Sequence, residues 1–166
     1  PLELRSPHED DAARPAAAFI AYDDEHLYLA VRCRRAPGDV APPAAGPRTR
    51  DADLSTYDRV DFCFDVDRDL ATFYRLTVDC RGWTAESCWD DRSWNPQWFV
   101  AAGGDAETWI VEAAIPWSEL VPQPPRPGDV WPCGAQRLAP TAGLQSWTAP
   151  ADVTIRPEGF GRLTFE

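Results

Sequence analysis

The sequence predicts an all-β fold, an antiparallel β-sandwich of about ten short strands, immunoglobulin-like or jelly-roll-like, with minimal helix. Apolar and polar residues alternate with a period of two in many short segments. Pro, Gly and Asp clusters between these segments mark turns. A helical period of 3.6 is almost absent. At 166 residues, the chain is expected to form one domain over 1–166 with a core of its own.

The central feature is a predicted hairpin. Alternating segments lie on either side of a polar break, at residues 60–65 and 74–79. A hairpin centred on Arg68 places Phe62 opposite Tyr74 on the core side. The same register places Asp61 directly opposite Arg75 on the other face, at contact distance. By residue type alone, a surface salt bridge of little energetic value is the preferred interpretation of this couple.

Further strands are predicted on both sides of this hairpin. In chain order they lie at residues 16–22, 27–33, 83–89, 99–102, 108–115, 130–138, 144–148 and 160–165. Both faces of the hairpin 16–33 carry apolar residues, so we expect it to be covered on both sides. Residues 1–15 are interpreted as an irregular lead-in, and 117–120 as one helical turn with Ser118 as a weak cap. The Pro-rich stretch 36–56 is a long loop without periodicity, a kind that is usually functional or disordered.

Charge restricts the partners. The net charge is −11 and all 16 basic residues are Arg. Such a surface repels phosphate, so neither nucleic acid nor an anionic membrane is an expected partner, whereas a neutral ligand is compatible with it. No apolar stretch of membrane-spanning length and no signal peptide are present. We therefore expect a module of a larger multidomain chain.

The five cysteines show no zinc-site spacing. Three lie in strand segments and are expected to be buried free thiols, namely Cys33, Cys63 and Cys133. Cys80 and Cys88 would close a short loop in an oxidising compartment, and the sequence leaves this pairing open.

Two other clusters have both a functional and a structural interpretation. Trp94 and Trp98 form either a second aromatic surface for a ligand or, as we favour, a cover over an open end of the core. Asp65, Asp67 and Asp69 alternate as calcium-binding carboxylates do, but an ordinary acidic turn is the preferred interpretation. Paired carboxylates such as those of Glu86 and Asp90 occur in any acidic protein, so no enzymatic activity is expected.

The order of segments resembles carbohydrate-binding modules of family 9, which bind the reducing ends of sugars. The matching pieces are Tyr22–Val31, Asp58–Asp65, Phe73–Val78, Trp109–Trp117, Ser146–Trp147 and Phe160–Phe165. The resemblance implies a β-sandwich that binds a saccharide and does no chemistry. It also implies a secreted, extracellular or periplasmic location and the possibility of structural calcium.

In this family an acidic residue, an Arg and a Gln hydrogen-bond the sugar, and two Trp enclose its ring. The matching positions here are Asp61, Arg75, Gln136 and, for one Trp, Trp147. The second Trp is missing near Ser55. Tyr57 is the candidate replacement, and a single aromatic surface implies weak binding.

Chemistry supports this interpretation, because sugar rings combine an apolar face with a rim of hydroxyl groups. One alternative is a sandwich that packs against other domains and has no sugar site. Related sandwiches serve as haem-binding subunits, but a chain with no Met and no Lys has a poor set of axial ligands.

Overall fold

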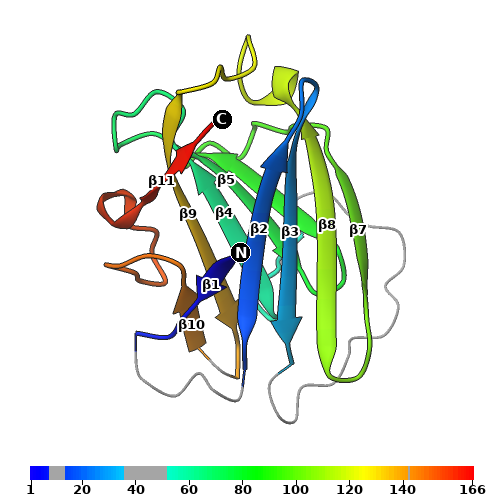
Figure 1. Ribbon diagram of the computed structural model, residues 1–166. Helices are drawn as coiled ribbons and strands as arrows, with labels where there is room; N and C mark the ends of the chain where they lie inside the picture. The colour runs from blue at the N-terminus through cyan, green and yellow to red at the C-terminus, as the bar shows by residue number, and fades with distance from the viewer. Residues whose placement is uncertain (8–13, 36–51, 142) are drawn as a thin grey trace.

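The computed structural model describes residues 1–7, 14–35, 52–141 and 143–166, and it confirms the all-β prediction (Figure 1). Two antiparallel sheets pack face to face as a β-sandwich. Two 3₁₀ helices, Trp117–Glu119 and Pro157–Gly159, are the helical elements of the described residues. No helix in this part of the chain is long and apolar enough to cross a membrane.

Sheet 1 has the order β1-β2-β3-β8-β7. Its strands are β1 (Leu2–Leu4), β2 (Ala16–Tyr22), β3 (His26–Arg34), β8 (Thr108–Pro116) and β7 (Phe99–Gly104). Sheet 2 has the order β10-β9-β4-β5-β6, and β11 also pairs with β9. Its strands are β10 (Gly143–Ser146), β9 (Val130–Ala139), β4 (Arg59–Phe64), β5 (Tyr74–Asp79), β6 (Thr84–Cys88) and β11 (Gly161–Thr164).

Two local predictions for sheet 1 are wrong. The lead-in contains a strand, because β1 pairs with β2 at the edge of the sheet. The β2–β3 hairpin is covered on one face only. Leu29 is buried against the core, whereas Phe19 and Tyr28 on the other face are 41% and 38% exposed. The apolar side chains of that outer face therefore reflect β propensity rather than burial.

The register of the β4–β5 hairpin differs from the prediction by two residues. Asp61 pairs with Thr77 rather than with Arg75, and Phe62 pairs with Leu76. An even shift leaves every side chain on its predicted face, because the period of a strand is two. Arg75 is thus a diagonal neighbour of Asp61 and remains within its reach.

The loop of residues 65–73 causes this shift. The Asp65 carboxylate accepts hydrogen bonds from the backbone N–H groups of Arg68 and Leu70, at 2.6 and 2.9 Å. Arg68 and Leu70 have positive φ angles of 65° and 54°, a conformation uncommon outside glycine. The carboxylate therefore stabilises a longer loop than residue alternation alone predicts.

A buried ion pair joins the two sheets. Arg137 of β9 is fully buried and binds Asp58 through two hydrogen bonds, of 2.8 and 2.6 Å. The Trp109 indole N–H on β8 donates to the same carboxylate at 2.7 Å. Arg137 also donates to the backbone carbonyl of Arg34 on β3 and to Gln145 on β10. The cluster therefore satisfies a charge that would be costly to bury alone.

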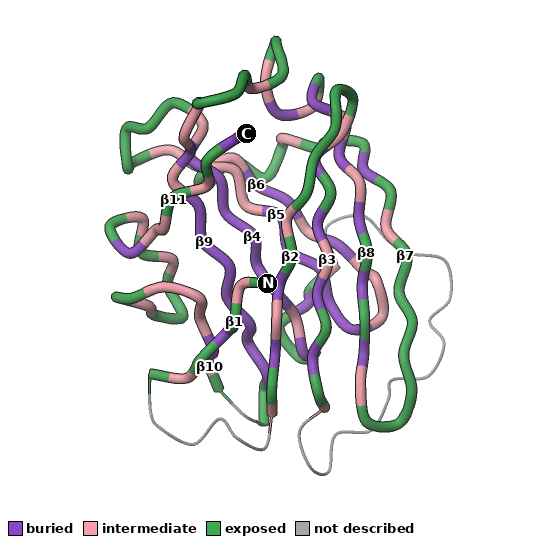
Figure 2. Tube along the Cα trace, in the orientation of Figure 1, coloured by how far each residue is buried: buried purple, intermediate pink, exposed green. Residues whose placement is uncertain are grey.

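Residues 147–160 cover part of the outer face of sheet 2. The ring of Phe160 lies so close to Gly134 that an added Cβ would be 2.9 Å from it. Cys63 is buried on this outer face, 1% exposed, and Asp61 is fully buried. Accordingly, Figure 2 shows β4 purple along most of its length, whereas the edge strand β7 is green.

All five cysteines are free. The antiparallel register places Cys88 opposite Tyr74, at one end of the β5–β6 hairpin, whereas Cys80 follows the other end. Strand geometry separates these ends by about 20 Å, beyond the reach of a disulfide. The pairing that the sequence left open is therefore excluded.

Removing Arg137 tests the buried ion pair with Asp58. Arg137→Met should lower the free energy of unfolding by about 3–5 kcal/mol, because Asp58 is left as an uncompensated buried charge. Adding Asp58→Asn should restore part of this loss. Urea unfolding measures both.

The control is Arg156→Gln, which removes an exposed partner of Asp152 and should cost about 1 kcal/mol or less. Equal losses for the buried and the exposed pair would contradict the role given to Arg137.

Thiol reactivity gives a second test of the fold. Burial raises the pKa of Cys33 and of Cys133 to about 12 in each case, so little thiolate exists at pH 8. Of the five thiols, that of Cys88 is partly exposed. In the native protein, iodoacetamide at pH 8 should therefore label Cys88 first, as peptide mass spectrometry would show, and all five should react in urea. Rapid native labelling of Cys33 would contradict this packing.

Candidate functional site

Three of the residues predicted from the sequence meet on the outer face of sheet 2. Register places Thr77 and Gln136 on either side of Asp61, on β5 and β9. Asp61 accepts hydrogen bonds from Thr77 Oγ1 at 2.7 Å, Arg75 Nη2 at 2.9 Å and Gln136 Nε2 at 3.4 Å. Asp61 is fully buried, so its carboxylate positions these neighbours rather than facing solvent.

Arg75 is the member of this network that reaches the surface. Its side chain is 34% exposed. Burial by itself would lower its pKa, but the charge of Asp61 and the hydrogen bond to it outweigh burial and raise the pKa. Within the described residues, Arg75 Nε is the buried side-chain nitrogen that has no hydrogen-bond partner. The guanidinium group is therefore permanently charged and incompletely satisfied.

A cleft of about 280 Å³ opens beside Arg75, close to the lower end of the volumes usual for small-molecule sites. Small side chains, Ala85 and Ser87 of β6, leave this space next to Thr77. The cleft is also lined by Arg59, Arg75, Arg92 and the segment 52–55.

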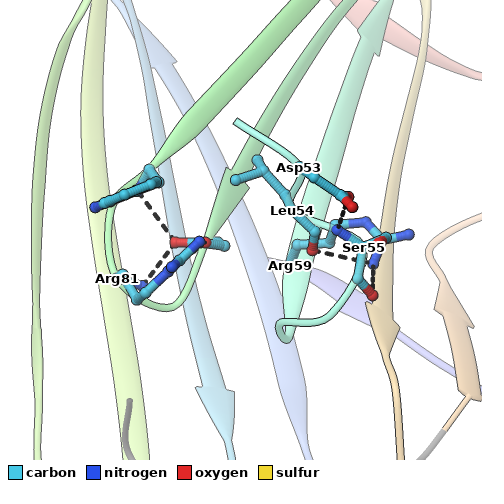
Figure 3. A network of polar contacts seen from close by, with 7 residues as sticks. Asp53, Leu54, Ser55, Arg59 and Arg81 are labelled. Atoms are coloured by element: carbon cyan, nitrogen blue, oxygen red, sulfur yellow. Dashed lines mark hydrogen bonds and ion pairs between the residues drawn. The ribbon is translucent and has the colours of Figure 1, made fainter. Parts of the chain in front are cut away.

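The segment 52–55, which lines one side of the cleft, is held in place by hydrogen bonds; Figure 3 shows those of residues 53–55. Arg59 Nη1 donates to the backbone carbonyls of Leu54 and Ser55, at 3.5 and 3.1 Å, and the Ser55 N–H donates to Asp53 at 2.9 Å. These hydrogen bonds from Ser55, and then the charges of Arg59 and Arg92, lower the pKa of Asp53. Ser55, where the resemblance expects a Trp, thus lies beside the cleft with a small side chain.

Tyr57 lies outside the lining of the cleft. The Arg81 guanidinium is 3.4 Å from the centroid of the Tyr57 ring and 4.2 Å from that of Trp83. Asp79 holds Arg81 through two hydrogen bonds of 2.8 and 2.6 Å. One face of the Tyr57 ring is therefore already occupied by a cation, and replacement of the missing Trp by Tyr57 stays a prediction.

The other predicted tryptophans pack on the core. Trp98 is 7% exposed, and its indole N–H donates to Glu86 at 2.6 Å. Trp94 is partly buried and lies against Tyr74, with ring centroids 4.6 Å apart. These positions correspond to the covering role that the sequence analysis favoured.

Trp147 is partly buried against the core, at the end of β10. Its ring approaches the backbone of Gly161 on β11 so closely that an added Cβ there would be 2.6 Å away. Trp147 is not part of the cleft lining beside Arg75. Stacking of a sugar on this ring stays a prediction.

The three loop carboxylates predicted as a cation site do lie together. One ligand atom from each of Asp65, Asp67 and Asp69 falls within 4.8 Å of the others. Hard carboxylate oxygens suit Ca²⁺. However, Asp65 and Asp69 already accept backbone N–H groups of the loop, and the Thr72 hydroxyl donates to Asp67 and Asp69. The donor set fits a cation, and the loop is also satisfied without one.

Sequence reasoning missed several residues of the cleft. Thr77, Ala85 and Ser87 share the outward parity of Arg75 along β5 and β6, so strand alternation was the available signal. Arg59 has the same parity as Asp61 on β4. No signal of this kind exists for Arg92, which lies outside the strands.

A larger hollow, of about 920 Å³, lies next to β1 and β2. The side chains of Arg5, Glu3, Arg34 and Glu107 in its lining are 77%, 65%, 52% and 78% exposed and form ion pairs with one another. Exposed paired charges contribute little to recognition, so the smaller cleft with its buried network is the better candidate.

Comparison with solved structures shows that the chain has the fold of family 9 carbohydrate-binding modules. A family 9 module from Caldicellulosiruptor kristjanssonii, in complex with cellotriose, superposes with a TM-score of 0.66 at 14% identity, covering 97% of this chain and 80% of that one. A glucose complex of a family 9 module from that organism gives a TM-score of 0.66 at 15% identity, covering 99% and 84%.

A candidate carbohydrate-binding protein from Bacteroides uniformis gives a TM-score of 0.71 at 17% identity, covering 99% of this chain and 85% of that one. No protein-family model and no curated protein matches the sequence. At these identities the similarity establishes the fold, and the site has to be argued from its own residues.

Calcium binding by the acidic loop can be tested directly. Because the loop satisfies its own carboxylates, the Tm in 5 mM CaCl₂ should lie within about 2 °C of the Tm in EDTA, measured by differential scanning calorimetry. A calcium-dependent rise of about 4 °C or more that Asp67→Asn abolishes would instead establish a cation site.

Proposed function

We propose that this protein is a non-catalytic carbohydrate-binding module and that the cleft beside Arg75 receives the sugar. The observation that carries the proposal is the Arg75 guanidinium, which buried Asp61 holds through Nη2 and whose exposed N–H groups lie at the wall of a preformed cleft. Sugar hydroxyl groups accept and donate hydrogen bonds, so they would satisfy these donors.

The network around Arg75 supports binding rather than chemistry. Asp61 is buried and accepts three hydrogen bonds, so it orients Arg75 and Gln136 and does not act on a ligand. Preorientation of this kind lowers the entropy cost of binding. With one guanidinium group and a shallow cleft, we infer weak affinity for a single sugar unit.

The ligands of the structural neighbours are consistent with a saccharide as the ligand of this protein. Two of them are family 9 modules, in complex with cellotriose and with glucose. We infer that this module also binds a saccharide. We infer further that it is part of a larger multidomain chain and that it is secreted or periplasmic. Binding of the reducing end and stacking on Trp147 are further parts of the same proposal.

Blocking the cleft tests the proposal. Ala85→Leu fills the space next to Ser87 with an outward side chain and leaves the core between the sheets untouched. It should weaken binding at least about tenfold, through steric exclusion, without lowering the Tm by more than a few degrees. Affinity electrophoresis against a panel of soluble polysaccharides, followed by calorimetric titration of the best ligand, provides the measurement.

The matched control is Ala101→Leu, an outward position on β7 of the other sheet. If neither Ala85→Leu nor Ala101→Leu changes the affinity, the sugar binds outside the cleft beside Arg75. Trp147→Ala, assayed at a temperature where the variant remains folded, separates two roles of this ring. If the ring stacks on the sugar, the substitution weakens sugar binding; if it only packs against the core, the substitution lowers the Tm and leaves the affinity unchanged.

A further inference from the structure

The lining of the cleft is richer in arginine than the acidic chain as a whole. The net charge of the protein is −11, yet three arginines, Arg59, Arg75 and Arg92, line the cleft. The carboxylate on the rim is that of Asp53. Glu86 also borders the cleft, but its carboxylate binds the Trp98 indole N–H in the interior of the sandwich. Among the residues that line the cleft, three arginines therefore stand against two carboxylates, and the charge of Arg75 is paired with that of buried Asp61.

Hydrogen-bond donors also outnumber acceptors there. Arg75 donates to Asp61 through Nη2, which leaves Nη1 for a ligand, whereas its unpartnered Nε is buried out of a ligand's reach. Arg59 uses Nη1 for the rim carbonyls. The Asp61 carboxylate, the strongest acceptor nearby, is buried and already accepts three hydrogen bonds. A ligand group that only accepts hydrogen bonds and carries negative charge is the complement of this lining.

The negative charge elsewhere on the chain does not oppose such a ligand at contact distance. The Debye length is about 8 Å at physiological ionic strength, so remote exposed carboxylates are screened. Guanidinium groups in the cleft wall are at contact distance and act on a bound anion directly. The local arrangement of charge, rather than its sum, therefore decides which ligand is accepted.

We propose that the saccharide bound in this cleft carries an anionic substituent, a carboxylate or a sulfate ester, which the arginines of the cleft receive. This inference rests on the proposed function and changes its substrate class from the neutral saccharide that net charge predicted to an acidic one. The planar carboxylate of a uronic acid matches the fork of a guanidinium group, and a sulfate ester offers the same acceptor chemistry.

The experiment compares sugars that differ in one group. The intact chain is titrated calorimetrically with methyl glucuronide and methyl glucoside, with methyl galacturonide and methyl galactoside, and with the 6-sulfates of both neutral sugars. At 20 mM NaCl the anionic member of at least one pair should bind about tenfold more tightly. At 500 mM NaCl most of this preference should disappear.

Arg92→Gln should reduce the ratio of anionic to neutral affinity by about two- to fivefold, since Arg92 is exposed. The matched control is Arg162→Gln, which removes an exposed arginine from β11, a strand separated from β5 by β4 and β9. The control should leave the ratio unchanged. If both substitutions lowered the ratio equally, the preference for anionic sugars would be an effect of the net charge of the protein, and the inference would be overturned.

If only the uronides are preferred, the anionic group is a carboxylate; if only the sulfates are preferred, it is a sulfate ester. If both are preferred, the site recognises negative charge in either form. Each of these outcomes supports the inference. Equal or weaker binding of every anionic sugar overturns it while the proposed function stands. If no sugar binds, or if binding survives Ala85→Leu, the proposed function fails as well.

Discussion

The ion pair between Asp58 and Arg137 is the constraint on which the rest of the structure depends. It joins β9 to the start of β4 inside the sandwich and is completed by Trp109 from the opposite sheet. A buried pair tolerates no slippage, because a shift of one residue would leave a charge unpaired in the core. The register of β4 against β9 is thereby set, and with it the position of Asp61 beside Gln136.

The candidate site exists because only part of the outer face of sheet 2 is covered. Residues 147–160 lie over β4 and β9, and Gly134 permits the close approach of Phe160. On β5 and β6 the same face is open, and Ala85 and Ser87 leave a cleft there. Asp61 lies at the boundary between the two regions. It is sheltered from water and yet holds Arg75, which reaches the open side.

This arrangement explains how an acidic protein holds an arginine at the wall of the cleft. A buried carboxylate is costly unless it is hydrogen-bonded, and the neighbours that satisfy Asp61 include the arginine that borders the cleft. The charge pair therefore satisfies the buried carboxylate and, at the same time, holds an arginine on the open side of the sheet. Total charge governs long-range steering and solubility, whereas the lining of the cleft governs which group a bound ligand presents to it.

The sequence by itself determined the β-sandwich class and the core face of the β4–β5 hairpin, because alternation with a period of two survives any even shift in register. The sequence also predicted that Asp61 and Arg75 lie together, although the predicted strand register differs from the observed one by two residues. Only the tertiary structure shows which groups pair with the buried charges of Asp58 and Arg137. Arg137 lies on the inward parity of an otherwise apolar strand, which signals a buried cation but not that Asp58 is its partner. Likewise, the cleft includes Arg92, and the covered part of the same face depends on residues 147–160. Both positions follow from packing between segments distant in the chain rather than from any local pattern.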